Sequence, residues 1–346
     1  MKSKIALTGL LPDELAELLD TYPLFRCRQL YQGILSGAKS FDEMSSLPVP
    51  MRKELEDNYK VSSGNVISEI KDSDGTVKLV MTMEDGAVIE GVILSDAEDR
   101  KTACLSTQAG CPMGCIFCKT GMMGFRRNLT ATEIAGQFML LKQKEPEITN
   151  IVIMGMGEPF LNLEALRKAI DFFMHSGGLN ISKRRITIST CGIEKGILDL
   201  ADHGPDIRLA LSLTTARQEL RERLMPVSRD NPLNKIKDAL IYFQKKREQR
   251  ITLEMVLLSG INTSAVESGA VAEFVRGMDA VINLIPWNPV QGLNLDGSAL
   301  KAPSNYEVAT FTGALKTRGL KVTQRYEKGQ KISAACGQLG ATGAIN

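Results

Sequence analysis

The chain has 346 residues, a formal net charge of +2, and 43% hydrophobic and 24% charged residues. It is long enough for one large domain with an appendage or for two domains, and its composition is that of a globular protein. No apolar run reaches the ~18–20 residues of a membrane helix, and Asp13 and Glu14 interrupt the first leucines before they resemble a signal peptide. We therefore expect a cytoplasmic protein with no membrane partner, in which clustered thiols favour metal binding or catalysis over disulfide scaffolding.

A net charge near zero does not exclude nucleic acid as a partner, because binding depends on local basic patches. Candidate patches are Arg126-Arg127, residues 183–185, the trio Arg217, Arg221 and Arg223, and residues 245–250. Each can equally be a solvated surface, and the 245–250 group suits the C-terminus of a predicted helix. The 183–185 group lies just before a predicted strand, where that explanation does not apply, so an RNA contact there stays open.

Residues 10–60 are predicted to form short helices, because Pro12 suits a helix start and Leu15, Leu18 and Leu19 have helical spacing. Residues 66–94 alternate in polarity and are rich in β-branched side chains. Asp-Gly turn signals stand at 74–75 and 85–86 within this stretch. The pattern predicts a small antiparallel sheet.

From about residue 102 onward, apolar strands alternate with helices. The predicted strands are 102–107, 150–155, 185–190, 207–213, 251–257 and 281–286, with a last one from residue 321. The predicted helices are 130–142, which a capping box of Thr130 and Glu133 opens, 163–174, 193–201, 233–246, 265–276 and 305–317. The pattern indicates an α/β fold with a helix-covered parallel sheet. Six βα units are too few for a closed eight-stranded barrel, so we predict a partial open (β/α)6 barrel with its chemistry at the carboxyl ends of the strands.

Three of the seven cysteines lie within "GCPMGCIFCKTG", shortly after the first barrel strand, at Cys111, Cys115 and Cys118. Structural zinc commonly takes two CxxC-type pairs, and no second pair exists. Both histidines, His175 and His203, lie outside any ligand spacing, and a thioredoxin-type pair would not require Cys111. Three thiolates of a [4Fe–4S] cluster, with the fourth iron open, explain the count better than zinc does.

CxxxCxxC after the first strand of a partial barrel resembles the radical S-adenosylmethionine (SAM) superfamily. After the next strand, "GMGEPF" contains Gly157, Glu158 and Pro159, which match the GEP motif that contacts the methionine amine in that superfamily. The resemblance implies a [4Fe–4S] cluster and SAM as cofactors, and a 5′-deoxyadenosyl radical as the reactive species.

Four further stretches, "GFRRNLTATEIAGQ", "SKRRITISTCGI", "INLIPWNP" and "AACGQL", together resemble the RlmN/Cfr family of RNA adenine methyltransferases over nearly the whole chain. The resemblance implies methyl transfer to C2 of an adenine in 23S rRNA and in tRNA, with two SAM molecules per turnover. Cfr-type methylation at C8 is the nearest alternative. Glu158-Pro159 favours the C2 enzymes, because the C8 enzymes often have alanine after that glutamate.

By this resemblance Cys336 carries the methyl group as S-methylcysteine, and Cys104 is the resolving cysteine that forms a disulfide with it to release the product. Glu90 corresponds to the proton acceptor, although one extra residue lies between Glu90 and Cys104. The resemblance also implies which residues bind SAM, namely Gly157, Glu158, Ser189, Ser212, Leu213, Thr214 and Asn288. Thr214 departs from the family, which has histidine there, and Ser333 stands for an aspartate. Trp287 is expected either to stack on a base or to pack under a loop.

We divide the chain into an N-terminal helical accessory domain (1–62), a small antiparallel β region (63–98), and the radical SAM barrel with its C-terminal catalytic loop (99–346). The expected partners are 23S rRNA, tRNA and an electron donor such as flavodoxin, and the chain is expected to be a monomer. Two other classes stay open at this stage. One is an iron–sulfur or zinc module that only binds RNA, and the other is a radical enzyme with a non-RNA substrate.

Overall fold

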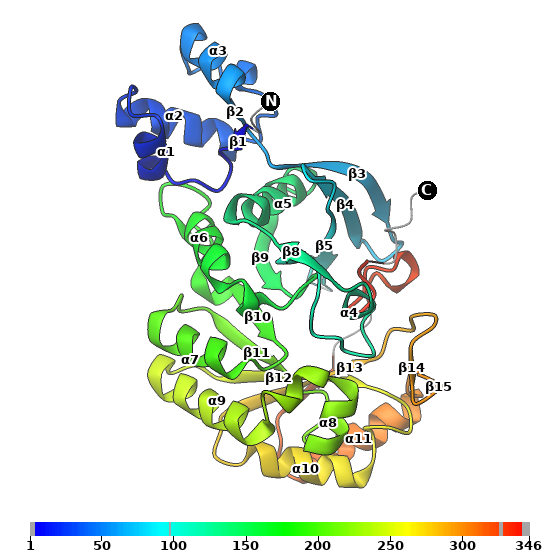
Figure 1. The fold of residues 1–346 in the computed structure, drawn as a ribbon. Coiled ribbons are helices and arrows are strands. Elements are labelled where there is room, and N and C mark those ends of the chain that lie inside the picture. The colour runs from blue at the N-terminus through cyan, green and yellow to red at the C-terminus, as the bar shows by residue number, and fades with distance from the viewer. Residues whose placement is uncertain (1–3, 97, 325–327, 341–346) are drawn as a thin grey trace.

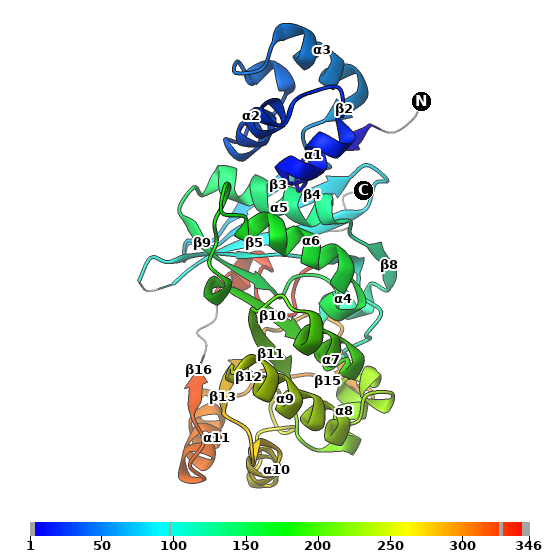
Figure 2. The same ribbon diagram turned by 90° about the vertical axis from the view of Figure 1, so that its left-hand side faces the viewer.

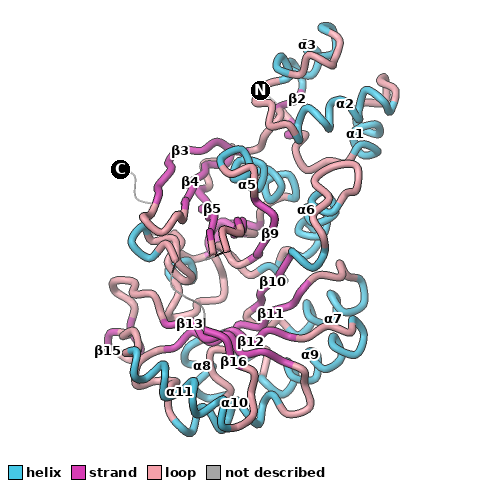
Figure 3. Tube along the Cα trace, turned by 180° about the vertical axis from the view of Figure 1, so that it is seen from behind, coloured by secondary structure: helices cyan, strands magenta, loops and turns pink. Residues whose placement is uncertain are grey.

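The computed structural model describes residues 4–96, 98–324 and 328–340. A 10-stranded sheet organises the fold, in the order β16-β13-β12-β11-β10-β9-β6-β5-β4-β3. Its strands are β3 (Gly64–Lys71), β4 (Val77–Met83), β5 (Val88–Ser95), β6 (Lys101–Cys104), β9 (Ile148–Ile153), β10 (Ile186–Thr190), β11 (Arg208–Ser212), β12 (Ile251–Leu257), β13 (Ala280–Pro286) and β16 (Val322–Gln324). The strands from β6 to β16 are parallel and curve into an open barrel (Figures 1 and 3). This confirms the predicted fold class.

The antiparallel region is continuous with the barrel. β5 pairs with β6 in antiparallel register, which sets Val92 opposite Cys104, and β4 and β3 follow outward. Directly opposed residues project from the same face of a sheet, as do alternate residues along a strand. Glu90 therefore projects from the same face as Cys104, and the three N-terminal strands extend the wall of the barrel interior.

The helices between the parallel strands agree with the predicted ones within a few residues. They are α5 (Ala131–Lys144), α6 (Leu163–Met174), α7 (Glu194–His203), α9 (Leu233–Arg247), α10 (Ala265–Val275) and α11 (Asn305–Thr317), and they form the outer layer (Figure 2). The predicted capping box is present. Glu133 N donates to Thr130 Oγ1 at 3.2 Å, and Thr130 N donates to the Glu133 carboxylate at 2.8 Å. Local capping chemistry thus fixes where α5 begins.

The N-terminal helices α1 (Pro12–Leu18), α2 (Leu24–Leu35) and α3 (Val49–Asn58) form a lobe at one end of the molecule, at the top of Figures 1 and 2. The lobe packs on α6, where the Tyr31 ring meets Phe172 edge to face at 5.8 Å between centroids. No helix in the described part of the chain is long and apolar enough to span a membrane.

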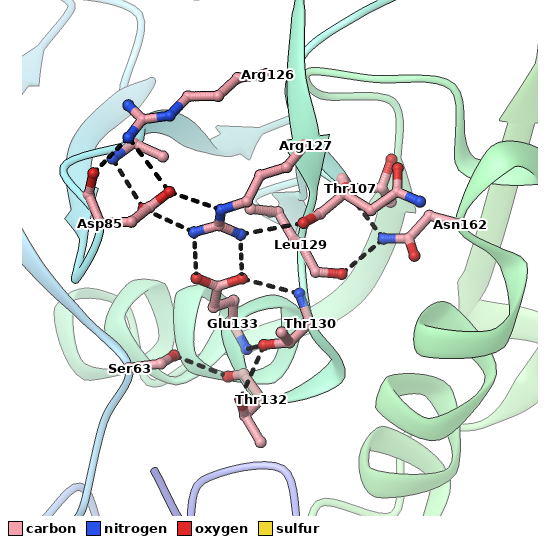
Figure 4. Close-up of polar contacts among 12 residues, drawn as sticks. Ser63, Asp85, Thr107, Arg126, Arg127, Leu129, Thr130, Thr132, Glu133 and Asn162 are labelled. Carbon is pink, nitrogen blue, oxygen red and sulfur yellow. Dashed lines mark hydrogen bonds and ion pairs between the residues drawn. The ribbon is translucent and has the colours of Figure 1, made fainter. Parts of the chain in front are cut away.

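A short hairpin of β7 (Gln108–Gly110) and β8 (Phe125–Asn128) emerges after β6 and frames the cysteine segment. Figure 4 shows how its second strand is anchored. Arg127 makes two hydrogen bonds to Asp85, in the β4–β5 turn, and two to Glu133, at the start of α5, all at 2.8 Å. One bidentate guanidinium therefore joins the hairpin, the antiparallel strands and the first barrel helix.

We expect Arg127→Met to lower the free energy of unfolding by about 1–3 kcal/mol, because it leaves the largely buried Glu133 carboxylate without its cation. Urea denaturation measures the change. The matched control is Arg126→Met, since Arg126 is half exposed and also meets Asp85. Its expected effect is below about 0.5 kcal/mol. Equal effects of the two substitutions would contradict the anchoring role of Arg127.

Candidate active site

The cysteine segment is the loop between β7 and β8, at the carboxyl end of β6. Gly110 opens it with a φ of +78°, and a side-chain Cβ there would lie 2.0 Å from the carbonyl oxygen of Gly124. Cys111 N donates to that same carbonyl at 2.9 Å and closes the loop at its base. Only glycine fits at position 110, because any side chain would force the two ends of the loop apart.

Cys111, Cys115 and Cys118 line one cavity of about 160 Å³ together with Glu158 and other residues of the strand ends. Burial raises the pKa of the Cys111 thiol to about 12, and burial also raises the pKa of Cys115. Within the described residues, no three His, Cys, Asp or Glu side chains are arranged to hold a single metal ion. The loop nevertheless presents three thiols to one cavity, as the sequence predicts.

Trp287 packs beneath the cysteine loop. Its side chain is 3% exposed, and its indole Nε1 donates to the Phe117 carbonyl at 2.9 Å. Of the two expectations for this residue, packing under the loop is therefore the one that the structure shows.

The Gly157-Glu158 pair lies on the wall of the same cavity. Gly157 has a φ of +104°, and a Cβ there would lie 2.6 Å from Gln108 Cβ, so glycine is required. Glu158 is buried, and its carboxylate accepts from Cys191 N at 2.8 Å and from Phe160 N at 3.1 Å. Burial raises the pKa of Glu158. The glutamate thus ties the end of β9 to the end of β10 while it borders the cavity.

Ser189 and Ser212 also line this cavity, and their hydroxyl oxygens are 3.3 Å apart. Leu213 and Thr214 are fully buried and are not among the residues that line it. Thr214 has a φ of +59°, and its buried Oγ1 has no hydrogen-bond partner among the described residues. Of these four residues, Ser189 and Ser212 thus line the cavity expected to bind SAM, whereas the side chains of Leu213 and Thr214 do not.

Sequence patterns grouped Arg221 with Arg217 and Arg223 as a possible basic surface patch, and for Arg221 this was wrong. It lies on α8 (Gln218–Leu224) and is completely buried. Its guanidinium donates to Ser228 Oγ and to three carbonyl oxygens, of Cys191 at 2.6 Å and of Ser212 and Leu213 at 3.2 Å. The sequence signal that was available is its position between Leu220 and Leu224 on one short helix.

Arg221 lies next to the cysteine loop, because Ile116 N in the loop donates to the carbonyl of Leu224 at 3.0 Å. Burial lowers the pKa of the guanidinium, and Cys191, Cys115 and Glu158 act in the opposite direction. No described carboxylate lies within ion-pair distance of Arg221. A buried cation is costly without an anion nearby. An anionic cluster on the three thiolates would offset that cost, so the residues present fit an iron–sulfur cluster.

A second cavity, of about 460 Å³, adjoins the first. Cys104, Cys336 and Asn288 are among the residues that line it. Met154, Ile285 and Cys336 line both cavities, so Cys336 lies where the cluster cavity and this outer cavity meet. No disulfide joins any of the cysteines, all seven of which lie in the described part of the chain.

Asn288 lines the outer cavity and not the cluster cavity. Its side-chain amide donates to the carbonyl of Cys336 at 3.1 Å, and its buried Oδ1 has no partner among the described residues. It thus holds the Cys336 backbone and keeps one buried acceptor that no described residue satisfies. Because a buried unsatisfied acceptor is costly, this atom fits a ligand that donates a hydrogen bond.

Residues 328–340, which we name the carrier segment, hold Cys336 in place. Lys119 N donates to Gly337 O at 2.7 Å, and Thr120 Oγ1 donates to Leu339 O at 2.9 Å, both from α4 (Lys119–Met122) at the end of the cysteine loop. Gly329 N donates to Asp74 in the β3–β4 turn at 2.8 Å. The carrier segment is therefore held between the cysteine loop and the antiparallel strands.

Glu90 and Lys78 lie under the carrier segment. They form an ion pair of 3.4 Å, and the two side chains are 2% and 0% exposed. Gly340 N donates to the Glu90 carboxylate at 2.6 Å, and Lys78 Nζ donates to Ser333 O at 3.2 Å. Glu90 is not among the residues that line the two cavities. The structure places the predicted proton acceptor beside the site, where it also binds the backbone of the carrier segment.

The residues and the fold define the class of the protein. The family model "Radical SAM superfamily" matches residues 105–268. The structure superposes on the crystal structure of a radical SAM methyltransferase from Sphaerobacter thermophilus with a TM-score of 0.92 and 36% identity, over 97% of this chain and 99% of that one. The chain is a radical SAM methyltransferase. Membership of this superfamily implies a [4Fe–4S] cluster and SAM as its cofactors, and Cys111, Cys115 and Cys118 would hold the cluster.

The comparisons also show the family within that class. A Treponema denticola protein named "Probable dual-specificity RNA methyltransferase RlmN" is 49% identical over 99% of this chain and 97% of its own length. A Thermus thermophilus protein of the same name is 39% identical over 88% of this chain and 85% of its own length. The chain belongs to the RlmN family.

We expect Arg221→Met to lower the free energy of unfolding by about 3 kcal/mol, because it strips the donors from three buried carbonyls. It should also lower the iron bound per chain after anaerobic reconstitution. The control is Arg223→Met, on the same helix, where the side chain is 54% exposed and pairs with Asp296 at the surface. A variant at Arg221 that keeps both its stability and its iron content would contradict the role of this cation.

Lys78→Met should speed amide hydrogen exchange in the carrier segment by roughly tenfold or more, because it removes both the cation that pairs with the buried Glu90 carboxylate and the donor to Ser333 O. Mass spectrometry of the peptide that spans 329–340 measures the rate. The control is Lys71→Met on β3, since Lys71 pairs with Glu69 and is 70% exposed. If exchange is the same in both variants, the ion pair does not hold the segment.

Proposed function

We propose that this chain methylates C2 of an adenine in 23S rRNA and in tRNA, with Cys336 as the methyl carrier. The observation that supports this most strongly is the position of Cys336 at the junction of two cavities. One cavity carries the three cluster cysteines and the GEP motif, and the other carries Cys104. A carrier must reach both the methyl donor and the acceptor base, and this position allows both.

A cluster held by Cys111, Cys115 and Cys118 and SAM bound beside it would supply the methyl group and an adenosyl radical able to take a hydrogen atom from methylated Cys336. The protein's part begins with binding and orientation. Gly157, Glu158, Ser189 and Ser212 border the space next to the cysteines, where a polar cofactor can accept and donate hydrogen bonds. Asn288 fixes the Cys336 backbone and has an acceptor available for the amine of an adenine or of the cofactor.

Cys104 lines the outer cavity with Cys336, which suits its role as resolving cysteine. After the carrier's methylene carbon has bonded to C2, the Cys104 thiolate attacks the Cys336 sulfur. An S–S bond forms, the S–CH2 bond breaks, C2 loses its proton and the methylene carbon gains one. The unpaired electron that the radical addition leaves on the base passes to an acceptor, a role that the oxidised cluster would fill. Glu90, on the same sheet face as Cys104, is the proposed acceptor for the proton from C2. A reductant must then return the disulfide to two thiols.

The location of the enzyme, its oligomeric state, its electron donor, its use of SAM and its domain division belong to the same proposal. The enzyme acts in the cytoplasm as a monomer, takes electrons from a donor such as flavodoxin, and uses two SAM molecules per turnover. The division into a helical domain (1–62), a β region (63–98) and the barrel (99–346) is retained, with the helical lobe and the β strands as accessory parts. A module that only binds RNA would require neither Cys104 nor Cys336 beside the cluster cavity, so the shared cavity favours the enzyme.

We expect Cys104→Ala to trap a covalent enzyme–RNA adduct through Cys336, because the adduct can form but cannot be resolved. Denaturing gels and mass spectrometry of the cross-linked peptide detect it. Cys336→Ala should give neither adduct nor product, and Cys27→Ala, a buried cysteine of α2, is the matched control with normal product. Nucleoside mass spectrometry of the wild-type product should show 2-methyladenosine. 8-Methyladenosine would assign the Cfr-type reaction instead, and absence of any methylated nucleoside would refute the proposal.

A further inference from the structure

A basic groove of about 570 Å³ lies at the amino ends of four neighbouring parallel strands, away from the cysteine loop. Its basic lining residues are Arg100, Lys101, Arg184, Arg185 and Arg208. Lys101 begins β6 and Arg100 directly precedes it. Arg184 and Arg185 belong to a 3-10 turn (Lys183–Arg185) that leads into β10, and Arg208 begins β11. The topology of the sheet thus gathers three separate sequence segments into one positive surface, the basic groove.

Much of this charge is not neutralised within the protein. Asp99 and Glu147 are the acidic residues of the groove. Asp99 pairs with Lys101, and Arg100 pairs with Asp96, so the uncompensated charge is that of the remaining three arginines. Arg184, Arg185 and Arg208 are exposed, and no carboxylate of the described residues lies within ion-pair distance of any of them. Three neighbouring guanidinium groups that repel each other without compensation indicate an anionic partner.

The basic groove adjoins the proposed substrate cavity. Arg100 lines both the groove and the outer cavity that contains Cys104 and Cys336. Lys328, in the carrier segment, adds a second cation to the lining of that cavity. From β6 to β11 the groove crosses three strand spacings, about 14 Å at ~4.8 Å each. That length suits a few consecutive phosphates of a single-stranded segment.

We propose that the basic groove binds the phosphate backbone of the RNA that flanks the target adenine, with Arg184, Arg185 and Arg208 as phosphate contacts. This inference rests on the proposed function, because it takes RNA as the substrate. The edge of adenine that carries C2 is hidden in a duplex, so the target base must leave its stack. The protein must then hold the flanking backbone at a fixed distance from Cys336. Arginine forks suit phosphate oxygens, and the cavity past Arg100 receives the base.

An acidic electron-donor protein could also bind a positively charged groove. The position of the groove relative to the cluster cavity favours RNA as the occupant. Thr149 of β9 lines the groove, and Ile153 of the same strand lines the cluster cavity. The two sites are therefore separated by about 13 Å along that strand at ~3.3 Å per residue. A donor that docks on the cysteine-loop side would be closer to the cluster.

The test uses the full-length, reconstituted enzyme and a fluorescein-labelled RNA stem-loop with an unpaired adenine. The groove variant combines Arg184→Glu, Arg185→Glu and Arg208→Glu. The control combines Lys168→Glu, Lys195→Glu and Lys235→Glu, the same change in net charge on exposed positions of α6, α7 and α9. Fluorescence anisotropy at several salt concentrations gives the affinity and its salt dependence. SAM-dependent methylation of Cys336, which needs no RNA, shows that each variant is folded.

The groove variant should bind RNA on the order of ten- to a hundredfold more weakly, and the slope of log K against log salt should shrink by about 2, since each single-strand phosphate contact contributes ~0.7. The control should change affinity less than threefold. Equal binding and equal slopes for the two variants would overturn the inference. So would a groove variant that binds RNA normally but accepts electrons more slowly from a flavodoxin. If the wild-type enzyme binds RNA through the groove but methylates no adenine, the proposed function fails and the groove assignment stands.

Discussion

The hydrogen bonds that hold the carrier segment against the barrel are the constraint on which the proposed chemistry depends. Cys336 lies outside the regular helices and strands, so contacts with other segments must fix its position. Three parts of the protein bind the backbone of the carrier segment. They are α4 at the end of the cysteine loop, the "PWNP" stretch through Asn288, and the β3–β5 region through Asp74 and Glu90. The N-terminal strands therefore do more than extend the sheet, because they supply one wall of the site and one anchor of the carrier.

Buried charges organise the two halves of the site in different ways. Under the carrier segment, Lys78 and Glu90 neutralise each other and also bind backbone groups of the segment. Beside the cysteine loop, Arg221 has carbonyl and hydroxyl partners only and keeps its positive charge uncompensated. The first arrangement fixes a segment of chain, and the second favours an anionic group nearby. At the surface, the arginines of the basic groove lack carboxylate partners in the same way, which favours binding of an anionic polymer there.

Sequence patterns predicted most of the barrel, because its strands and helices carry strong local periodicity and α5 has a capping box. They did not predict the β7–β8 hairpin, whose short strands lack alternation, or α8, which is mostly polar. Cysteine spacing predicted the three cysteines, and the resemblance to the RlmN/Cfr family implied Glu158 and the two serines, which lie at or after the carboxyl ends of their strands. Two features depend on contacts between distant segments, which local periodicity does not encode. These are the burial of Arg221, which requires carbonyls from two strand ends, and the pairing of Glu90 with Lys78.

The central claim is that Cys336 receives a methyl group within the cluster cavity and delivers it to a base in the outer one. The most direct measurement is mass spectrometry of the C-terminal peptide after anaerobic reconstitution and incubation with SAM that carries a trideuterated methyl group. The account predicts a trideuterated methyl group on Cys336, and its loss when RNA is added together with an electron donor. An unmodified Cys336 in an enzyme with an intact cluster and bound SAM would contradict it.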